Sequence, residues 1–122
     1  MSKGFIRIWR SLLCSILIAC CGLAQALPQD QIAYQDLPRE AKTTIALIKK
    51  GGPFPYDKDG AVFGNYEKRL PKQPRGYYRE YTVKTPYARN RGAKRIITGG
   101  EREPLQYFYT EDHYKSFRRV IE

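Results

Sequence analysis

The chain has 122 residues and a formal net charge of +10 at pH 7, with 22 lysines and arginines against 12 acidic residues. This length suits one domain and excludes a multidomain enzyme. The charge favours a polyanionic partner such as nucleic acid, anionic lipid or acidic polysaccharide, although many basic proteins bind nothing specific.

The first 26 residues have the features of a secretory signal peptide. A basic segment precedes an apolar run over residues 11–19, and the small residues Ala24 and Ala26 mark a cleavage point after Ala26. The run is too short to span a bilayer comfortably. We therefore predict a signal peptide over residues 1–26 and one domain over residues 27–122, secreted from the cell.

Cys20 supports a competing processing route. It closes a Leu-Ile-Ala-Cys pattern, which is typical of bacterial lipoproteins, so the alternative is a lipid-anchored or periplasmic protein. We expect no membrane contact unless Cys20 is lipidated. All three cysteines lie in the leader, so residues 27–122 contain no disulfide and no cysteine–zinc site. Without the three basic residues of the leader, the domain keeps 19 basic and 12 acidic residues, a net charge of +7.

Residues 37–50 predict the one long helix. Pro38 suits the first helical position, and Ala41, Ile45 and Ile48 recur at helical spacing to form one apolar stripe. Gly51 and the glycine after it end the helix.

The rest of the domain predicts short strands. Residues 53–76 are rich in Gly, Pro, Asp and Lys, which indicates loop with one short strand at most. Further strand candidates follow at residues 77–85, 93–98, 105–110 and 116–121. In the first of them, Tyr78, Glu80 and Thr82 share one face. The sequence therefore predicts an α+β fold, in which one N-terminal helix packs on an antiparallel sheet.

Two residues stand out chemically. His113 is the only histidine and lies at the end of a strand candidate, although a lone histidine is often without a role. Glu80 lies in mid-strand, where a carboxylate is costly to bury unless it is paired. The simplest alternative for Glu80 is a structural pair with a nearby basic residue. The nearby basic residues form a cluster of Arg89, Arg91, Lys94 and Arg95. Such a cluster is more often a solvent-exposed face than a binding site.

Together these groups suit RNA cleavage. RNA carries a 2′-hydroxyl beside its phosphodiester, so one base, one acid and stabilising cations suffice without a metal. We find no metal-ligand spacing, P-loop or dinucleotide-binding pattern, and we predict no cofactor. A catalytically silent protein that binds RNA or another polyanion is the alternative, but such a protein has no use for an acid–base pair.

Five ordered motif blocks carry a resemblance to a known family. They extend over residues 52–67, 77–86, 88–92, 95–99 and 112–114. The chain resembles the small extracellular guanyl-specific ribonucleases of the barnase superfamily, from about Leu37 to Phe117. The resemblance implies the microbial ribonuclease fold and cleavage of single-stranded RNA after guanosine, through a 2′,3′-cyclic phosphate that is then hydrolysed to a 3′-phosphate.

The resemblance also implies roles for the catalytic residues. Glu80 matches the general base for the 2′-hydroxyl, and His113 matches the general acid for the 5′ oxygen. Arg91 and Arg95 match the arginines that hold the scissile phosphate. Tyr114 is expected to hydrogen-bond the same phosphate.

Guanine recognition is expected in residues 63–67. Glu67 would accept both N1–H and the exocyclic amine, while backbone amides around Asn65 and Tyr66 would donate to O6. Phe63 would pack on the base, although plain core packing is the alternative. Relatives often carry a polar residue and an arginine where Gly64 and Tyr66 stand here. Tyr66 can still stack on a base.

Single-stranded RNA is the expected partner, with no specificity for DNA. The resemblance makes a small acidic inhibitor protein conceivable, but the sequence itself does not indicate one. We expect a monomer.

Overall fold

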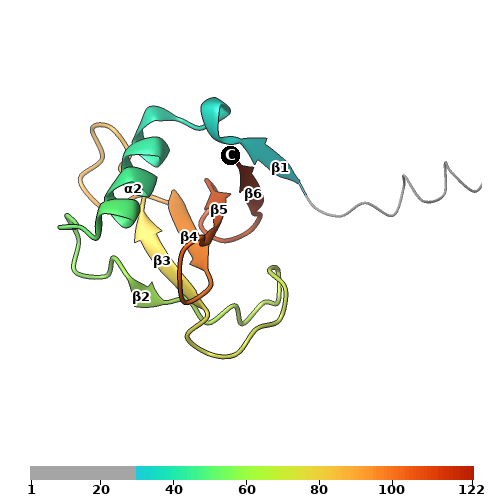
Figure 1. The fold of residues 1–122 in the computed structure, drawn as a ribbon. Coiled ribbons are helices and arrows are strands. Elements are labelled where there is room, and N and C mark those ends of the chain that lie inside the picture. Colours follow the sequence, from blue (N-terminus) through green and yellow to red (C-terminus); the bar gives the residue numbers. More distant parts are fainter. Residues whose placement is uncertain (1–29) are drawn as a thin grey trace, which may run out of the picture.

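The computed structural model describes residues 30–122, so the predicted signal peptide and the lipidation at Cys20 lie outside the described residues. In the described part of the chain, no helix is long and apolar enough to cross a membrane. The elements in chain order are β1 (Gln31–Ala33), a 3-10 turn (Tyr34–Asp36), α2 (Arg39–Lys50), β2 (Ala61–Val62), β3 (Tyr78–Thr82), β4 (Arg95–Gly99), β5 (Gln106–Thr110) and β6 (Arg118–Ile121) (Figure 1).

Helix α2 starts one residue later than predicted. Pro38 keeps an extended backbone, with ψ at 150°, and its carbonyl accepts the amides three and four residues ahead at 3.0 and 3.1 Å. It therefore caps the helix rather than forming its first turn. The end is confirmed, because Gly51 adopts the left-handed conformation at φ 88° and its amide donates to the carbonyl of Leu47 at 2.9 Å.

The six strands form one sheet in the order β1-β6-β5-β4-β3-β2. All neighbouring pairs are antiparallel except β1 and β6, which run parallel. The predicted α+β fold, with one helix on a sheet, is confirmed, and the sheet is antiparallel from β2 to β6. At the β1 edge, where no strand was predicted, the pairing is parallel instead. Because β1 and β6 are joined through the whole domain rather than by a hairpin, no tight turn forces them to run in opposite directions. Figure 1 shows β1 beside β6 at the far edge from β2.

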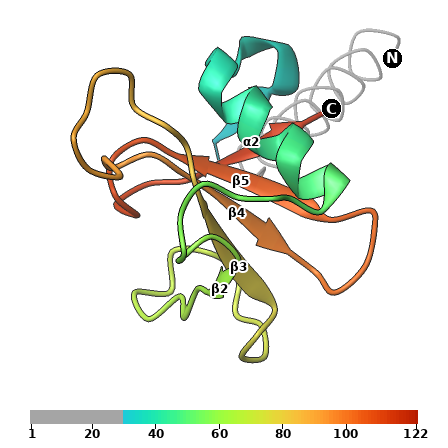
Figure 2. The same ribbon diagram turned by 90° about the vertical axis from the view of Figure 1, so that its left-hand side faces the viewer.

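One face of the sheet packs against α2, which lies across it in Figure 2. The register places Tyr81 opposite Ile96 and Ile96 opposite Tyr109, so these three side chains share that face. The hydroxyl of Thr44 in α2 donates to the carbonyl of Thr82 in β3 at 3.0 Å. The buried core between helix and sheet consists of Leu37, Ala41, Ile45, Ile48, Val83, Ile96, Tyr107, Tyr109 and Val120.

The other face carries the predicted Tyr78, Glu80 and Thr82, as the register confirms. The segment between β2 and β3 folds over part of it. This second, smaller core consists of Leu70, Tyr78, Ile97 and Phe108, with Phe63, Tyr77, Tyr114 and Phe117 packed against it. Because Thr82 pairs with Arg95 and Arg95 pairs with Thr110, the β3–β4 and β5–β6 loops leave the sheet at the same end. These loops and Glu80 meet there.

Candidate active site

The carboxylate of Glu80 lies at the centre of this end of the sheet, with 16% of its side chain exposed. Its Oε1 accepts a hydrogen bond from Nη2 of Arg91 at 2.9 Å, and its Oε2 accepts one from the hydroxyl of Tyr114 at 3.0 Å. Nε of Arg91 also donates to the hydroxyl of Thr82 at 3.0 Å. A largely buried carboxylate needs such partners, and here they also fix its orientation.

Arg95 supports the turn that carries Arg91. It is only 3% exposed, and its Nη1 donates to the carbonyls of Gly92 and Lys94 at 2.9 and 2.8 Å. Gly92 has φ at +68°, and a Cβ there would come within 2.5 Å of the Thr85 hydroxyl, so the turn requires glycine. Among the described residues, nothing accepts a hydrogen bond from the buried Nε of Arg95.

Tyr114 joins the carboxylate to an aromatic cluster. Its ring stacks on Phe63 with the ring centroids 4.9 Å apart. Burial first, and then the neighbouring Glu80 carboxylate, raise the pKa of Tyr114 to about 12, against the opposing effect of Arg95. The phenol therefore stays protonated at neutral pH and remains a hydrogen-bond donor to Glu80.

His113 is exposed at the rim of the site. Its ring centroid lies 4.8 Å from that of Tyr114, and its amide donates to the carbonyl of Ala93 at 3.2 Å, which ties the two loops together. Both His113 and Tyr114 have positive φ, at 54° and 72°. Non-glycine residues rarely adopt this conformation, so the contacts around the loop must hold it in place.

Asp112 holds the loop in this conformation, and the sequence reasoning missed it. Its carboxylate accepts hydrogen bonds from the hydroxyl of Thr110 at 2.9 Å and from the amide and hydroxyl of Ser116. The hydrogen bond from the Ser116 hydroxyl is the largest of the effects that lower the pKa of Asp112 to about 2. The only sequence signal was an Asp beside the histidine, in a short loop where Asp commonly binds nearby backbone and hydroxyl groups.

A pocket of about 190 Å³ opens beside this cluster. Its lining includes every residue predicted to bind guanine and adds two that the sequence reasoning missed, Arg69 and Phe117. The lining residues are Phe63, Asn65, Tyr66, Glu67, Arg69, Tyr114 and Phe117. Arg69 follows Glu67 by two positions, and a basic residue so near an acidic one could have indicated the ion pair that they form.

The polar residues of the pocket are already partly engaged. Glu67 is exposed, and its Oε2 accepts a hydrogen bond from Nε of Arg69 at 2.9 Å. The side chain of Asn65 both donates to and accepts from the backbone of Leu70, at 2.9 and 3.1 Å, and so shapes the loop. The carbonyl of Asn65 also accepts the amide of Lys68 at 3.0 Å, so both its side chain and its backbone hold the loop that borders the pocket.

Tyr66 is 81% exposed and forms a wall of the pocket. Its ring lies over the backbone of Gly64, where a Cβ would come within 2.4 Å of the ring carbons. Gly64 is thus the residue that leaves room for Tyr66 in this position.

The structure thus gathers the sequence-predicted residues into two adjoining groups. Glu80, Arg91 and Tyr114 share one hydrogen-bond network, with Arg95 beneath it and His113 at its rim. Tyr114 belongs to both this network and the pocket. Within residues 30–122, no three carboxylate or histidine side chains are grouped so that they could hold a metal ion. The arrangement offers a fixed carboxylate, two guanidinium groups and an imidazole beside a pocket that can hold a planar ring.

Comparisons with known proteins point to one group of enzymes. A family model described as ribonuclease matches residues 22–121. The chain is 55% identical over 92 residues to guanyl-specific ribonuclease St of Saccharopolyspora erythraea, which covers 75% of this chain and 88% of that protein. It is 56% identical over 89 residues to guanyl-specific ribonuclease Sa of Kitasatospora aureofaciens. This match covers 73% of this chain and 91% of that protein. The crystal structure of ribonuclease Sa2 with guanosine-2′-cyclophosphate superposes with a TM-score of 0.71 at 41% identity, over 77% of this chain and 97% of that one.

Proposed function

This chain belongs to the ribonuclease family that includes the guanyl-specific ribonucleases St and Sa, and on that premise we propose that it cleaves single-stranded RNA on the 3′ side of guanosine. One observation carries the proposal above the others. Tyr114 lines the base-sized pocket and also donates a hydrogen bond to Glu80, so a nucleoside held in the pocket has its ribose beside a fixed carboxylate.

In the first step, Glu80 acts as the general base. It accepts the proton of the 2′-hydroxyl, the 2′ oxygen attacks phosphorus, and the bond from phosphorus to the 5′ oxygen breaks. The imidazolium of His113 gives its proton to the departing 5′ oxygen. The products are a 2′,3′-cyclic phosphate and a strand with a free 5′-hydroxyl. Arg91 and Arg95 stabilise the charge that develops on the phosphorane, since fixed cations are most effective where water is excluded.

In the second step, the two roles are exchanged. His113, now neutral, takes a proton from water, which attacks the cyclic phosphate. Glu80, now protonated, returns its proton to the 2′ oxygen as that bond breaks, and a 3′-phosphate results. Both residues end in their starting states.

Guanine is selected in the pocket beside Tyr114. Glu67 accepts the two adjacent donors of guanine, N1–H and the exocyclic amine, and leaves its partner Arg69 free to turn to solvent. An exposed ion pair of this kind is weak and is readily exchanged. Phe63 and Tyr66 provide the aromatic surfaces.

The proposal is tested by the cleavage of GpA, ApA, CpA and UpA in EDTA by the wild-type protein and by Glu67→Gln. We expect turnover of GpA in preference to the other three, and loss of that preference in Glu67→Gln, whose amide would oppose a donor of guanine. Equal turnover of all four substrates by the wild type would refute guanine selection. No turnover of any of them would leave an RNA-binding protein on a ribonuclease fold.

We further propose that residues 1–26 direct secretion and are removed. The order of basic segment, apolar run and small residues at Ala24 and Ala26 supports this. N-terminal sequencing of the secreted protein should begin at Leu27. A lipidated N-terminal Cys20 would instead support the lipoprotein route.

A further inference from the structure

A second pocket adjoins the one proposed for guanine and is not used by that proposal. It has a volume of about 260 Å³ and shares Phe63, Asn65 and Tyr66 with the first pocket. Neither Tyr114 nor Phe117 lines it, so it does not include the tyrosine that contacts the Glu80 carboxylate, whereas Tyr66 lines both pockets. Its remaining lining residues are Gly64, Lys68, Lys72, Gln73, Pro74, Arg75 and Tyr78.

The charge of this second pocket is of one sign. Lys68, Lys72 and Arg75 line it, and none of its lining residues is acidic. Among residues 30–122, none of these three cations takes part in an ion pair, whereas the neighbouring Arg69 is paired with Glu67. Three unpaired cations around one hollow attract an anion. Arg75 also donates to the hydroxyl of Tyr66 at 3.4 Å, so the basic pocket and the base pocket share a connected wall.

We propose that this second pocket binds a backbone phosphate of the RNA strand on the 5′ side of the guanosine. The inference rests on the proposed function, which places guanine in the first pocket and its 3′-phosphate at Glu80. The strand 3′ of guanosine therefore leaves beside Glu80 and His113. The second pocket lacks Tyr114 and adjoins the base pocket at Tyr66, so we assign it to the strand on the other, 5′ side, whose phosphates are the anions that Lys68 and Lys72 meet.

A dinucleotide such as GpA has no phosphate on the 5′ side of guanosine, so it can occupy only the first pocket. Comparison with a longer strand therefore isolates the contribution of the second pocket. The probes are the non-cleavable tetranucleotide CpCpdGpA and the dinucleotide dGpA, both lacking the 2′-hydroxyl of guanosine. The variant is Lys68→Gln together with Lys72→Gln. Glutamine has a Cβ and a similar length, so it leaves the backbone preference of the loop unchanged. This matters at Lys68, whose φ is +57°.

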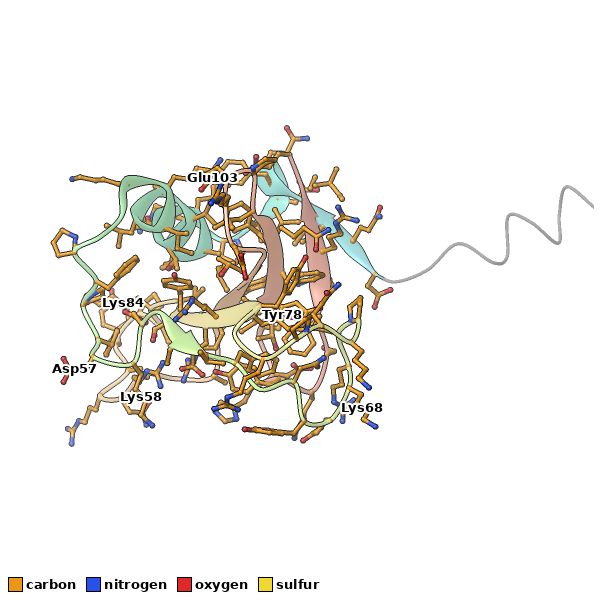
Figure 3. All side chains as sticks on the ribbon, turned by 60° about the horizontal axis from the view of Figure 1, so that its bottom comes forward. Asp57, Lys58, Lys68, Tyr78, Lys84 and Glu103 are labelled. Carbon is orange, nitrogen blue, oxygen red and sulfur yellow. The ribbon has the colours of Figure 1, made fainter. Side chains whose placement is uncertain are left out.

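The matched control is Lys50→Gln together with Lys58→Gln, which removes the same charge elsewhere. Lys50 ends helix α2 on the opposite face of the sheet. Lys58 lies at the other end of the molecule from Lys68 (Figure 3). Both controls are exposed lysines, so general electrostatic attraction to RNA is reduced equally.

For CpCpdGpA, we expect the Lys68/Lys72 variant to raise the Kd roughly five- to tenfold at 50 mM salt. The slope of log Kd against log salt concentration should become shallower by about 0.7, because one phosphate contact to a single strand is lost. Binding of dGpA should change by less than about twofold in both double variants, as expected for lost long-range attraction alone. The proposal is overturned if the control weakens CpCpdGpA equally, or if dGpA is weakened as much as the tetranucleotide. Cleavage of GpA by the wild type tests the proposed function separately, because GpA does not reach the second pocket.

Discussion

The hydroxyl of Tyr114 and the carboxylate of Glu80 lie 34 positions apart in the chain and meet at 3.0 Å. With Arg91 on the other carboxylate oxygen, both oxygens of Glu80 have a donor, so the carboxylate cannot rotate freely. A general base must face the proton that it removes, and small misplacements of such a group are costly. Tyr114 is therefore a positioning residue for Glu80 as well as part of the pocket wall.

Removal of this hydroxyl in Tyr114→Phe should lower kcat for GpA about ten- to a hundredfold, because a hydrogen bond to a charged group contributes about 1.5–3 kcal/mol. The ring and its stacking on Phe63 are retained, so KM should change little. Tyr107→Phe is the control, since that hydroxyl is buried without a partner among the described residues. An unchanged kcat in Tyr114→Phe would show that the phenol does not position Glu80.

Tyr114 should also be recognisable in an alkaline titration. Its pKa is raised from 10.0 to about 12 in the folded protein, mainly by burial. The difference in phenolate absorbance between the wild type and Tyr114→Phe should therefore have its midpoint near pH 12. Because the folded pKa is the higher one, the contribution of Tyr114 to stability is present below pH 10 and is lost as the pH rises towards 12. A midpoint near pH 10 would contradict the buried contact with Glu80.

Asp112 gives the opposite pH dependence. Its pKa falls from 3.8 to about 2 on folding, chiefly through the hydrogen bond from the Ser116 hydroxyl. Its contribution to stability is present above pH 3.8 and is lost as the pH falls towards 2. Asp112→Asn should therefore lower the Tm most at pH 5 and hardly at all at pH 2, while Asp57→Asn, an exposed control, should not change the Tm at either pH. A constant difference in Tm across this range would rule out the titration of Asp112 as its cause.

Much of the fold could be predicted from local patterns. The stripe of Ala41, Ile45 and Ile48 and the glycines after Lys50 defined helix α2, and alternation along β3 placed Glu80 on the correct face. Strand β1 could not be predicted, because three residues are too few to show a period of two. Its parallel pairing with β6 depends on how the whole chain returns to this edge of the sheet.

In the site, too, individual residues could be predicted from the sequence, whereas contacts between distant segments could not. A lone histidine, a mid-strand carboxylate and a nearby basic cluster brought His113, Glu80 and Arg91 into consideration. The structure places them around Tyr114. The contact between the Tyr114 hydroxyl and Glu80 could not be predicted, because it depends on how the β5–β6 loop folds back over the sheet. The hydrogen bonds of Asp112 that hold this loop were missed for the same reason.

Gly64 provides a test of the pocket wall. In Gly64→Ala, the new Cβ would lie 2.4 Å from the ring of Tyr66, so the ring must leave its present position in the pocket wall. Stacking of a base on an aromatic side chain contributes about 1–3 kcal/mol, so KM for GpA should rise about fivefold or more with kcat unchanged. Tyr66→Ala should reproduce this change, and Tyr66→Phe should not. If Tyr66→Ala leaves KM unchanged, Tyr66 does not contact the base.

The central claim is that Glu80 and His113 form the acid–base pair, and the most direct measurement is the turnover of GpA in EDTA by the wild type, Glu80→Gln and His113→Ala, followed by phosphorus NMR. The account predicts that the wild type forms a 2′,3′-cyclic phosphate and then a 3′-phosphate. Each variant should be slower in the first step by about 10²–10⁴-fold, the range expected for loss of a general acid or base. Turnover by either folded variant within tenfold of the wild type would contradict the assignment of that residue.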